Sequence, residues 1–287
     1  MTAETPLPAL DLLVVGGLTI DRFADGSSAP GGTAVHVARA AARGGMRLGV
    51  VTSVGPEPEA ALGLAELREH TGFLNSTQHA VTPTFRHQEG PSGRRLWLER
   101  VGGPVLLQAS DASRFTTRAV LYAPIAGEIE LDSLDALSSS LPRAAILQGW
   151  LRPTEEGVEI RPLSLGTLDP GVAAALGGFD LLVASREDLV ADGTEPGEQL
   201  TALRDTVGAR PALVVTNSVD GLWLDVAGQR EHVPAPWIVR DAPTVGAGDI
   251  LAAFLIVPSA DPAEDWVRRA ADAMRVVAED LEARKRS

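Results

Sequence analysis

The sequence contains no cysteine, which excludes disulfide bonds, thiolate chemistry and zinc sites with cysteine ligands. It also lacks long apolar runs: stretches such as Ile250–Val257 fall far short of the ~20 residues that a membrane-spanning helix needs. The segment Met1–Pro8 has no basic residues of the kind that begin a signal peptide. We therefore expect a cytoplasmic protein without a membrane partner.

Positive charge and aromatic side chains are both scarce. The formal net charge is −13, and no basic face of the kind that nucleic-acid binding requires stands out in the sequence. We therefore expect no nucleic-acid partner. Aromatic residues make up only 4% of the chain, which argues mildly against a pocket that stacks a nucleoside base. An acidic protein can still bind phosphates when backbone N–H groups form the site.

Apolar runs of strand length alternate with helical patterns along the 287 residues, and hydrophobic residues make up 45% of them. Strands are expected at Asp11–Val15, Leu48–Val54, Ala144–Gln148, Leu181–Ala184 and Ala212–Thr216. Helices are expected at Thr33–Arg43, Glu57–His70, Asp132–Leu141, Asp169–Leu176, Gly197–Val207, Ala247–Leu255 and Pro262–Arg284. This alternation predicts one α/β domain over residues 1–287, with a mainly parallel sheet covered by helices on both faces.

Two stretches interrupt the alternation. Thr82–Val105 contains a Gly-Pro-Ser-Gly turn at residues 90–93, which predicts a β-hairpin standing off the main sheet. Gly221–Val233 also has the pattern of a β-hairpin, with Ala227-Gly228 at its turn. Neither stretch resembles a linker, so one fold over the whole chain is favoured.

The segment Gly246-Ala247-Gly248-Asp249 lies just before an apolar helix. Consecutive N–H groups at the positive end of a helix can stabilise the charge on a phosphoryl group in transfer. A carboxylate beside them can accept the proton of an attacking hydroxyl. The structural alternative is a tight loop in which Asp249 satisfies helix N-terminal donors.

The earlier part of the chain holds a second set of candidates. Asp21 follows the first strand, where α/β folds commonly bind ligands, although it could equally be a turn residue. The pair Gly31-Gly32 would let a ligand approach the backbone closely, or would simply form a turn before a helix. His36 lies one turn into that helix, where a packing role is the commoner one.

Two more segments follow predicted strands in the second half. Thr216–Gly221 could line a nucleotide or serve as a hairpin connection. Ser185–Asp188 could contact a phosphate or metal, or could cap a helix through Ser185. The sequence contains no P-loop, no Gly-x-Gly-x-x-Gly after the first strand, no Gly-x-Ser-x-Gly and no His-Glu-x-x-His.

The order of these segments resembles the ribokinase-like (PfkB) family of carbohydrate and nucleoside kinases over almost the whole chain. The matching segments are Val14–Asp21, Gly31-Gly32, Val51–Gly55, Thr216 with Gly221, and Gly246–Asp249, the last being the most specific. The resemblance implies a three-layer αβα sandwich and an ATP- and Mg²⁺-dependent transfer of a phosphoryl group to a hydroxyl of a sugar, polyol or nucleoside. It is compatible with a monomer or a homodimer.

The resemblance also implies roles for individual residues. Asp249 would be the general base, and the N–H groups of Gly246, Ala247 and Gly248 would form the anion hole. The substrate would be held by Asp21, Gly31, Gly32 and His36. ATP would lie along Thr216, Ser218, Asp220, Gly221 and Ser185. Mg²⁺ would bind near Asp188, which would contact the ion through water.

Several positions differ from the family pattern. The family has Asn where this chain has His36, Gly where it has Ser218, and Asn and Glu where it has Ser185 and Asp188. Val245 also stands where the family has a second Thr. These differences leave open a second hypothesis, a kinase-derived protein that binds a sugar or nucleotide with little or no turnover. Because only Arg22–Pro30 separate Asp21 from Gly31, we expect no strand pair there, and a lid reduced to the Thr82–Val105 hairpin.

Overall fold

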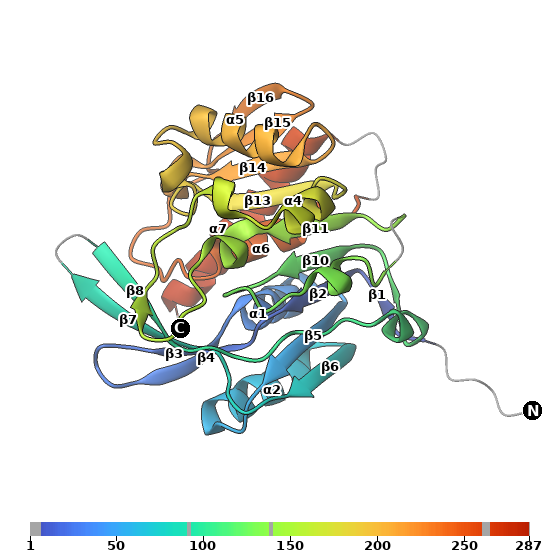
Figure 1. Cartoon of the computed structure of the whole chain (residues 1–287), viewed down its shortest axis with the longest axis vertical. Coiled ribbons are helices and arrows are strands. Elements are labelled where there is room, and N and C mark those ends of the chain that lie inside the picture. Colours follow the sequence, from blue (N-terminus) through green and yellow to red (C-terminus); the bar gives the residue numbers. More distant parts are fainter. Residues whose placement is uncertain (1–6, 91–92, 138–139, 260–264, 287) are drawn as a thin grey trace, which may run out of the picture.

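The computed structural model describes residues 7–90, 93–137, 140–259 and 265–286. Its central sheet has nine strands in the order β16-β15-β14-β13-β11-β10-β2-β5-β6 (Figure 1). These are β2 (Leu12–Gly16), β5 (Leu48–Val54), β6 (Phe73–Gln78), β10 (Val120–Ala123), β11 (Arg143–Ile146), β13 (Leu181–Ser185), β14 (Ala212–Thr216), β15 (Leu222–Val226) and β16 (Gln229–Val233). The seven strands from β14 to β6 are parallel, whereas β15 and β16 continue the sheet antiparallel.

Burial on both faces explains why the inner strands read as continuous apolar runs. All five residues of β2 are buried. Leu12 and Val14 belong to one core cluster, and Leu13 and Val15 belong to another on the opposite face, as the two-residue period of a strand requires. The central sheet therefore separates two apolar cores.

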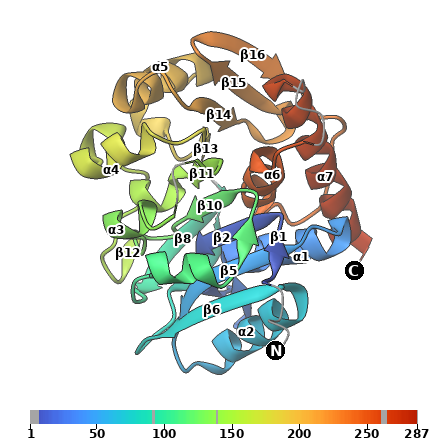
Figure 2. The ribbon, with the colours of Figure 1, turned by 90° about the vertical axis from the view of Figure 1, so that its right-hand side faces the viewer.

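Helices cover each of these cores, as Figures 1 and 2 show. One face carries α1 (Thr33–Gly44), α2 (Pro58–His70), α6 (Ala247–Ile256) and α7 (Trp266–Arg286). The other face carries α3 (Leu131–Leu134), α4 (Pro170–Leu176) and α5 (Pro196–Val207). The predicted three-layer α/β architecture with a mainly parallel sheet is confirmed. Among the described helices, none has both the length and the apolar character needed to cross a membrane.

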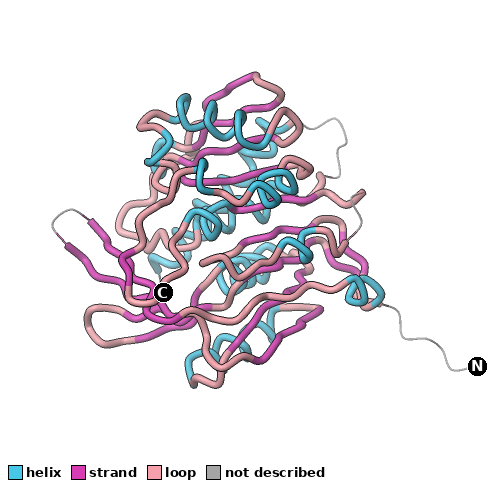
Figure 3. The backbone as a smooth tube through the Cα atoms, in the orientation of Figure 1, coloured by secondary structure: helices cyan, strands magenta, loops and turns pink. Residues whose placement is uncertain are grey.

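A second sheet of five strands stands off the central one, on the left in Figures 1 and 3, and we call it the small sheet. Its order is β12-β8-β7-β3-β4, formed by β12 (Val158–Glu159), β8 (Gly93–Arg100), β7 (Thr84–Gly90), β3 (Thr19–Arg22) and β4 (Ser28–Gly31). The remaining described strands, β1 (Ala9–Leu10) and β9 (Thr116–Thr117), pair with each other in a separate two-stranded sheet.

The small sheet is larger than the reduced lid that the sequence led us to expect. The predicted hairpin is present as β7 and β8, although part of its turn, residues 91–92, lies outside the described residues. However, β3 and β4 also pair with each other, from Thr19↔Gly31 to Arg22↔Ser28. The prediction of no strand pair was wrong because the motif residues themselves form the strands, and only the turn has to fit between Arg22 and Ser28.

Most predicted elements lie within two or three residues of the observed ones, and Leu48–Val54 and Ala212–Thr216 match their strands at both ends. The helix expected over Asp132–Leu141 is wrong in length, because α3 ends at Leu134, and residues 138–139 lie outside the described part. Residues 262–264 of the last expected helix also lie outside it, and α7 begins at Trp266.

Candidate functional site

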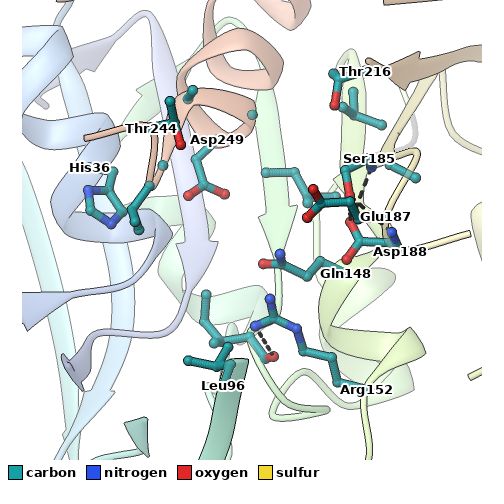
Figure 4. A pocket seen from close by; sticks show the side chains of 18 of the residues that line it. His36, Leu96, Gln148, Arg152, Ser185, Glu187, Asp188, Thr216, Thr244 and Asp249 are labelled. Atoms are coloured by element: carbon teal, nitrogen blue, oxygen red, sulfur yellow. Dashed lines mark hydrogen bonds between the residues drawn. The ribbon is translucent and has the colours of Figure 1, made fainter. Parts of the chain in front are cut away.

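A cavity of about 540 Å³ opens where the carboxyl ends of the parallel strands meet the small sheet. Figure 4 shows a close view of it. The predicted site residues that line it are Asp21, Gly32, His36, Ser185, Asp188, Thr216, Ser218, Gly246, Ala247, Gly248 and Asp249. Three others do not line it: Gly31, Asp220 and Gly221. The structure therefore gathers into one cavity residues that the sequence spreads over more than two hundred positions.

Helix α6 begins at this cavity. Gly246 precedes it with a left-handed backbone (φ 80°), and no side chain caps the helix. The N–H of Ala247 donates to the carbonyl of Thr244 at 3.1 Å, which closes the turn. A Cβ added at Gly248 would meet no atom within 4 Å, so the backbone there is open to the cavity. An anion could approach the positive end of α6 at this point.

Asp249 lies in the first turn of α6, and its Oδ1 accepts a hydrogen bond from the hydroxyl of Thr33 at 2.9 Å. Figure 4 shows its carboxylate pointing into the cavity. The residue is partly exposed as a whole, but its carboxyl lies deep enough for burial to raise its pKa. His36 and the Thr33 hydroxyl act in the opposite direction and lower that pKa. A carboxylate with a raised pKa is a better proton acceptor than an exposed one.

Asp21 enters the cavity from β3 of the small sheet. Its Oδ1 lies 3.3 Å from Nε2 of His87, a buried residue of β7, and 3.4 Å from the hydroxyl of Thr19. Gly31 packs behind it, because a Cβ there would lie 2.3 Å from Oδ2 of Asp21. Gly31 thus contributes space for Asp21 and does not line the cavity.

His36 is buried in α1 beside the turn that precedes α6. A Cβ added at Gly246 would lie 2.3 Å from Cγ of the His36 ring, so the ring and the glycine fit against each other. Burial lowers the pKa of His36, although the charge of Asp249 acts to raise it. Gly32 makes an equally close approach, since its Cβ would lie 2.3 Å from the carbonyl oxygen of Gly17.

On the opposite side of the cavity, Ser185 and Asp188 form a tight turn after β13. Oδ2 of Asp188 accepts hydrogen bonds from the hydroxyl of Ser185 at 2.7 Å and from its backbone N–H at 3.1 Å (Figure 4). No described helix begins there, so the helix-cap alternative for Ser185 does not hold. Within the described residues, no group of three or more His, Asp or Glu side chains could hold a metal ion.

The loop after β14 contains the predicted nucleotide-binding residues. Ser218 has a left-handed backbone (φ 49°), the conformation in which glycine is the least strained residue. Gly221 has a φ of 95°, and a Cβ there would lie 2.2 Å from the carbonyl oxygen of Val233. Asp220 is exposed, and its carboxylate accepts a hydrogen bond from Asn217 at 3.2 Å, so it braces the loop.

A second, mostly apolar hollow of about 160 Å³ adjoins the cavity. It shares five residues with the cavity, namely Thr216, Ser218, Thr244, Ala247 and Gly248. Its apolar lining includes Val219, Trp237, Ile238, Met274, Val277 and Leu281. Val219 and Ile238 are each 52% exposed, which is unusual for large apolar side chains unless they form a binding surface.

The basic end of α7 holds the loop in front of Gly246. Arg284 donates to the carbonyls of Val245 at 2.5 Å and Pro243 at 3.2 Å, and Lys285 donates to the carbonyl of Arg240 at 3.1 Å. Arg284 is anchored in turn by an ion pair with the buried Asp280 at 2.6 Å. The basic tail is therefore connected to the candidate active-site loop.

Sequence reasoning missed several side chains of the cavity. His87 lies in the predicted hairpin, but its sequence position gave no indication that it would face Asp21. Gln148 and Arg152 belong to a segment, Gln-Gly-Trp-Leu-Arg, that starts at the last residue of a predicted strand and was assigned no role. Their position after a strand of the parallel sheet was the available signal.

No family model and no curated protein sequence matches the chain. Many solved structures do resemble it. A pyrophosphate-dependent kinase in the ribokinase family, complexed with a pyrophosphate analog and myo-inositol, is 17% identical, with a TM-score of 0.74 over 94% of this chain and 95% of that one. Ribokinase from Thermotoga maritima is 13% identical, with a TM-score of 0.66 over 98% and 100% of the two chains.

Fructokinase from Vibrio cholerae O395 is 21% identical, with a TM-score of 0.64 over 98% of this chain and 100% of that one. At these identities the likeness establishes the fold and not the activity. The chain has the ribokinase-like fold, and the resemblance expected from its sequence is confirmed at that level.

Proposed function

We propose that the protein is a kinase that transfers the terminal phosphoryl group of ATP to a hydroxyl of a small sugar or polyol. The observation that carries the proposal is the placement of Asp249 at the start of α6, with its carboxylate pointing into the cavity beside the open backbone of Gly248. A base and an anion-binding helix end in one cavity are two of the elements on which enzymatic phosphoryl transfer depends.

Asp249 takes the proton of the attacking hydroxyl. Burial favours this role because it raises the pKa of the carboxyl, and the hydrogen bond from Thr33 holds the carboxyl in place. The backbone at Gly246 and Gly248 stabilises the charge that develops on the phosphoryl oxygens. Asp21 and Gly32, on the small-sheet side, hold the hydroxyls of the acceptor.

The second hollow supports ATP as the donor. It is apolar, adjoins the cavity at Ser218 and Gly248, and is lined by side chains of α7 and of the loop that contains Trp237. A flat base in this hollow would place its phosphates along Thr216 and Ser218 toward α6. Mg²⁺ bound mainly by phosphates and water needs only one or two carboxylates, and Asp188 and Glu187 line the cavity on this side.

Turnover across donors and acceptors tests the proposal. Product formation is measured with ATP or pyrophosphate as donor and a panel of sugars and polyols as acceptors. ATP-dependent product is expected, and nucleotide binding without product would favour the alternative of a binding protein.

A pair of variants tests the base-binding hollow. Val219→Arg is expected to raise the KM for ATP at least ~10-fold, because a charged side chain fills an apolar subsite. Leu62→Arg, at a position of α2 that is 66% exposed and remote from the hollow, is the matched control and should leave that KM unchanged. An equal KM for ATP in V219R and the wild type would exclude this hollow as the base site.

A further inference from the structure

Gln148 projects from a turn that is packed into the protein. The turn, Leu147–Leu151, follows β11 in the middle of the central sheet. The leucines at its two ends are each 1% exposed and belong to the core on one face of that sheet. A Cβ added at Gly149 would lie 2.2 Å from the carbonyl oxygen of Pro124, so the turn also packs closely against the segment after β10. These contacts fix the backbone on both sides of Gln148.

The side chain of Gln148 is half-buried and lines the cavity of about 540 Å³. Figure 4 shows its amide directed into the part of the cavity into which Asp249 points. Among the described residues, this side chain takes part in no hydrogen bond. An amide offers two N–H donors and a carbonyl acceptor, and leaving them unpaired is costly once a ligand displaces the water around them. A ligand that covers Gln148 must therefore supply it with partners.

The charges around this space favour a neutral ligand over an anion. Asp249 and Asp21 line the cavity from α6 and β3. Arg152 lines it as well, and its charge already acts on carboxyl groups of the protein. Burial raises the pKa of Glu128 and of Asp249, and the charge of Arg152 lowers both pKa values. Arg152 thus compensates carboxyl groups of this chain, while the neutral amide of Gln148 is available to a ligand.

A hydroxyl group matches an amide because each of them both donates and accepts hydrogen bonds. A site that binds a hydroxyl of its substrate in this way discriminates against an analogue without it, because the polar group of the site is then left unpaired. We propose that Gln148 binds a non-reacting hydroxyl of the acceptor and so selects a neutral, polyhydroxylated compound, while another hydroxyl of the same molecule faces Asp249. This inference rests on the proposed kinase function and names a residue that sets its acceptor specificity.

The position of Gln148 gives the acceptor polar contacts from two different sheets. Asp21 reaches the cavity from β3 of the small sheet, whereas Gln148 reaches it from the turn after β11 of the central sheet. Because that turn is packed on both sides, the amide is held at a defined place, as selection among similar hydroxyls requires. An acceptor with a single hydroxyl could not contact Asp21, Gln148 and Asp249 together.

The experiment compares sugars and polyols with analogues that lack one hydroxyl. Glucose, ribose and sorbitol are the parent compounds, and each is measured with ATP and Mg²⁺ beside those monodeoxy analogues that retain the phosphorylated hydroxyl. The wild type is expected to favour at least one parent over one of its analogues by ~10-fold or more in kcat/KM, because the analogue leaves the amide unpaired. Calorimetry without the donor gives the same comparison as a ratio of Kd values.

Gln148→Met removes the amide and keeps an unbranched side chain of similar length. In Q148M the preference for that parent should fall to within ~3-fold of unity, because no polar group is left unpaired by the analogue. Both rates of the ratio come from one preparation, so partial unfolding of the variant does not change it. Gln229→Met makes the same chemical change at an exposed position of β16 outside the cavity and should keep the wild-type preference.

The two measurements separate this inference from the proposed kinase function. Equal preferences in Q148M and the wild type, or no wild-type preference for any parent over its analogues, would overturn the role of Gln148 whether or not product forms. Product formation alongside such a result would leave the kinase function standing. A binding preference that is lost in Q148M, without product from any compound, would support Gln148 as a hydroxyl-binding residue and refute the kinase function.

Discussion

The hydroxyl of Thr33 donates a hydrogen bond to Oδ1 of Asp249 at 2.9 Å, although 216 positions separate the two residues in the sequence. Thr33 is the first residue of α1, directly after Gly32, and is itself buried. The contact joins the start of α1 to the start of α6. It therefore fixes the proposed base relative to the side of the cavity where we propose that the acceptor binds.

Replacing Thr33 by Val removes this hydrogen bond while keeping the shape of the side chain. The bond favours the charged carboxylate, so its loss raises the pKa of Asp249 further. The acid limb of kcat against pH should then move to higher pH, and kcat at neutral pH should fall roughly 10-fold, as loss of a bond to a charged group implies. Thr33→Ser keeps the hydroxyl and should restore both. An unshifted acid limb in T33V would show that the hydroxyl does not act on the base.

Substitution by Ala is expected to have different effects on stability at the two glycines before Asp249. Gly246→Ala introduces a Cβ at φ 80° and 2.3 Å from the His36 ring, so it should destabilise the protein by at least about 2 kcal/mol. Gly248→Ala meets no atom within 4 Å and should be neutral or stabilising by up to about 1 kcal/mol.

Measurements of kcat should show a second effect of these substitutions, one that stability measurements do not show. The Cβ of G248A projects into the space where an anion would approach, so kcat should fall despite the intact fold. Urea denaturation and initial rates measure the two effects. A stable G248A variant with wild-type kcat would argue against an anion site at this helix end.

Burial of His36 gives the protein a pH-dependent stability. Its pKa in the folded state lies below the usual value of 6.5, so the unfolded state binds the proton more tightly. The contribution of His36 is therefore fully present above about pH 6.5 and is lost as the pH falls through the folded pKa. The raised pKa of Asp249 changes stability with pH in the opposite direction. The test therefore compares two proteins that both carry Asp249→Asn and differ only at residue 36.

In that background, the urea midpoint of D249N should fall more steeply between about pH 7.5 and pH 5 than that of D249N with His36→Asn. The difference in slope reports the proton that His36 must take up. Parallel curves would mean that His36 is not buried in its neutral form.

The carbonyl contacts of Arg284 predict that the end of α7 positions the candidate active-site loop in front of Gly246. Arg284→Gln removes one of the two ion pairs of buried Asp280, which keeps its pair with Arg43, and weakens the contacts with Val245 and Pro243; the loss should cost about 1.5–3 kcal/mol. At a temperature where the variant remains folded, kcat should fall while the KM for the acceptor stays near the wild-type value. Arg286→Gln, at a side chain that is 72% exposed, is the control. A change in R284Q stability without a change in kcat would limit Arg284 to a structural role.

Local patterns were enough to predict the layers of the fold. Runs such as Leu12–Val15 are apolar throughout because both of their faces are buried, and that signal is visible in the sequence. The edge strand Phe73–Gln78 was missed because most of its side chains are polar and only partly buried. The pair β3 and β4 was missed because its residues were read as a motif and not as strands.

The candidate site likewise contains residues that a local sequence pattern reveals and residues that it does not. Asp249 and its glycines were found because their spacing places them at one turn before one helix. His87 and Arg152 lie on different parts of the chain and reach the cavity only through the tertiary fold, which also brings Thr33 to Asp249. Their roles depend on distances across the sheet, such as the 3.3 Å between His87 and Asp21, which no local pattern encodes.

The most direct test of the account is the turnover of Asp249→Asn beside the wild type, with ATP and the best acceptor of the panel. Asn keeps the size of the side chain but cannot take a proton, so kcat should fall by ~10²–10⁴-fold while the calorimetric Kd of the acceptor stays within a few-fold. D249N should also be at least as stable as the wild type, because a buried charge is removed. A folded D249N protein with wild-type kcat would contradict the assignment of Asp249 as the base.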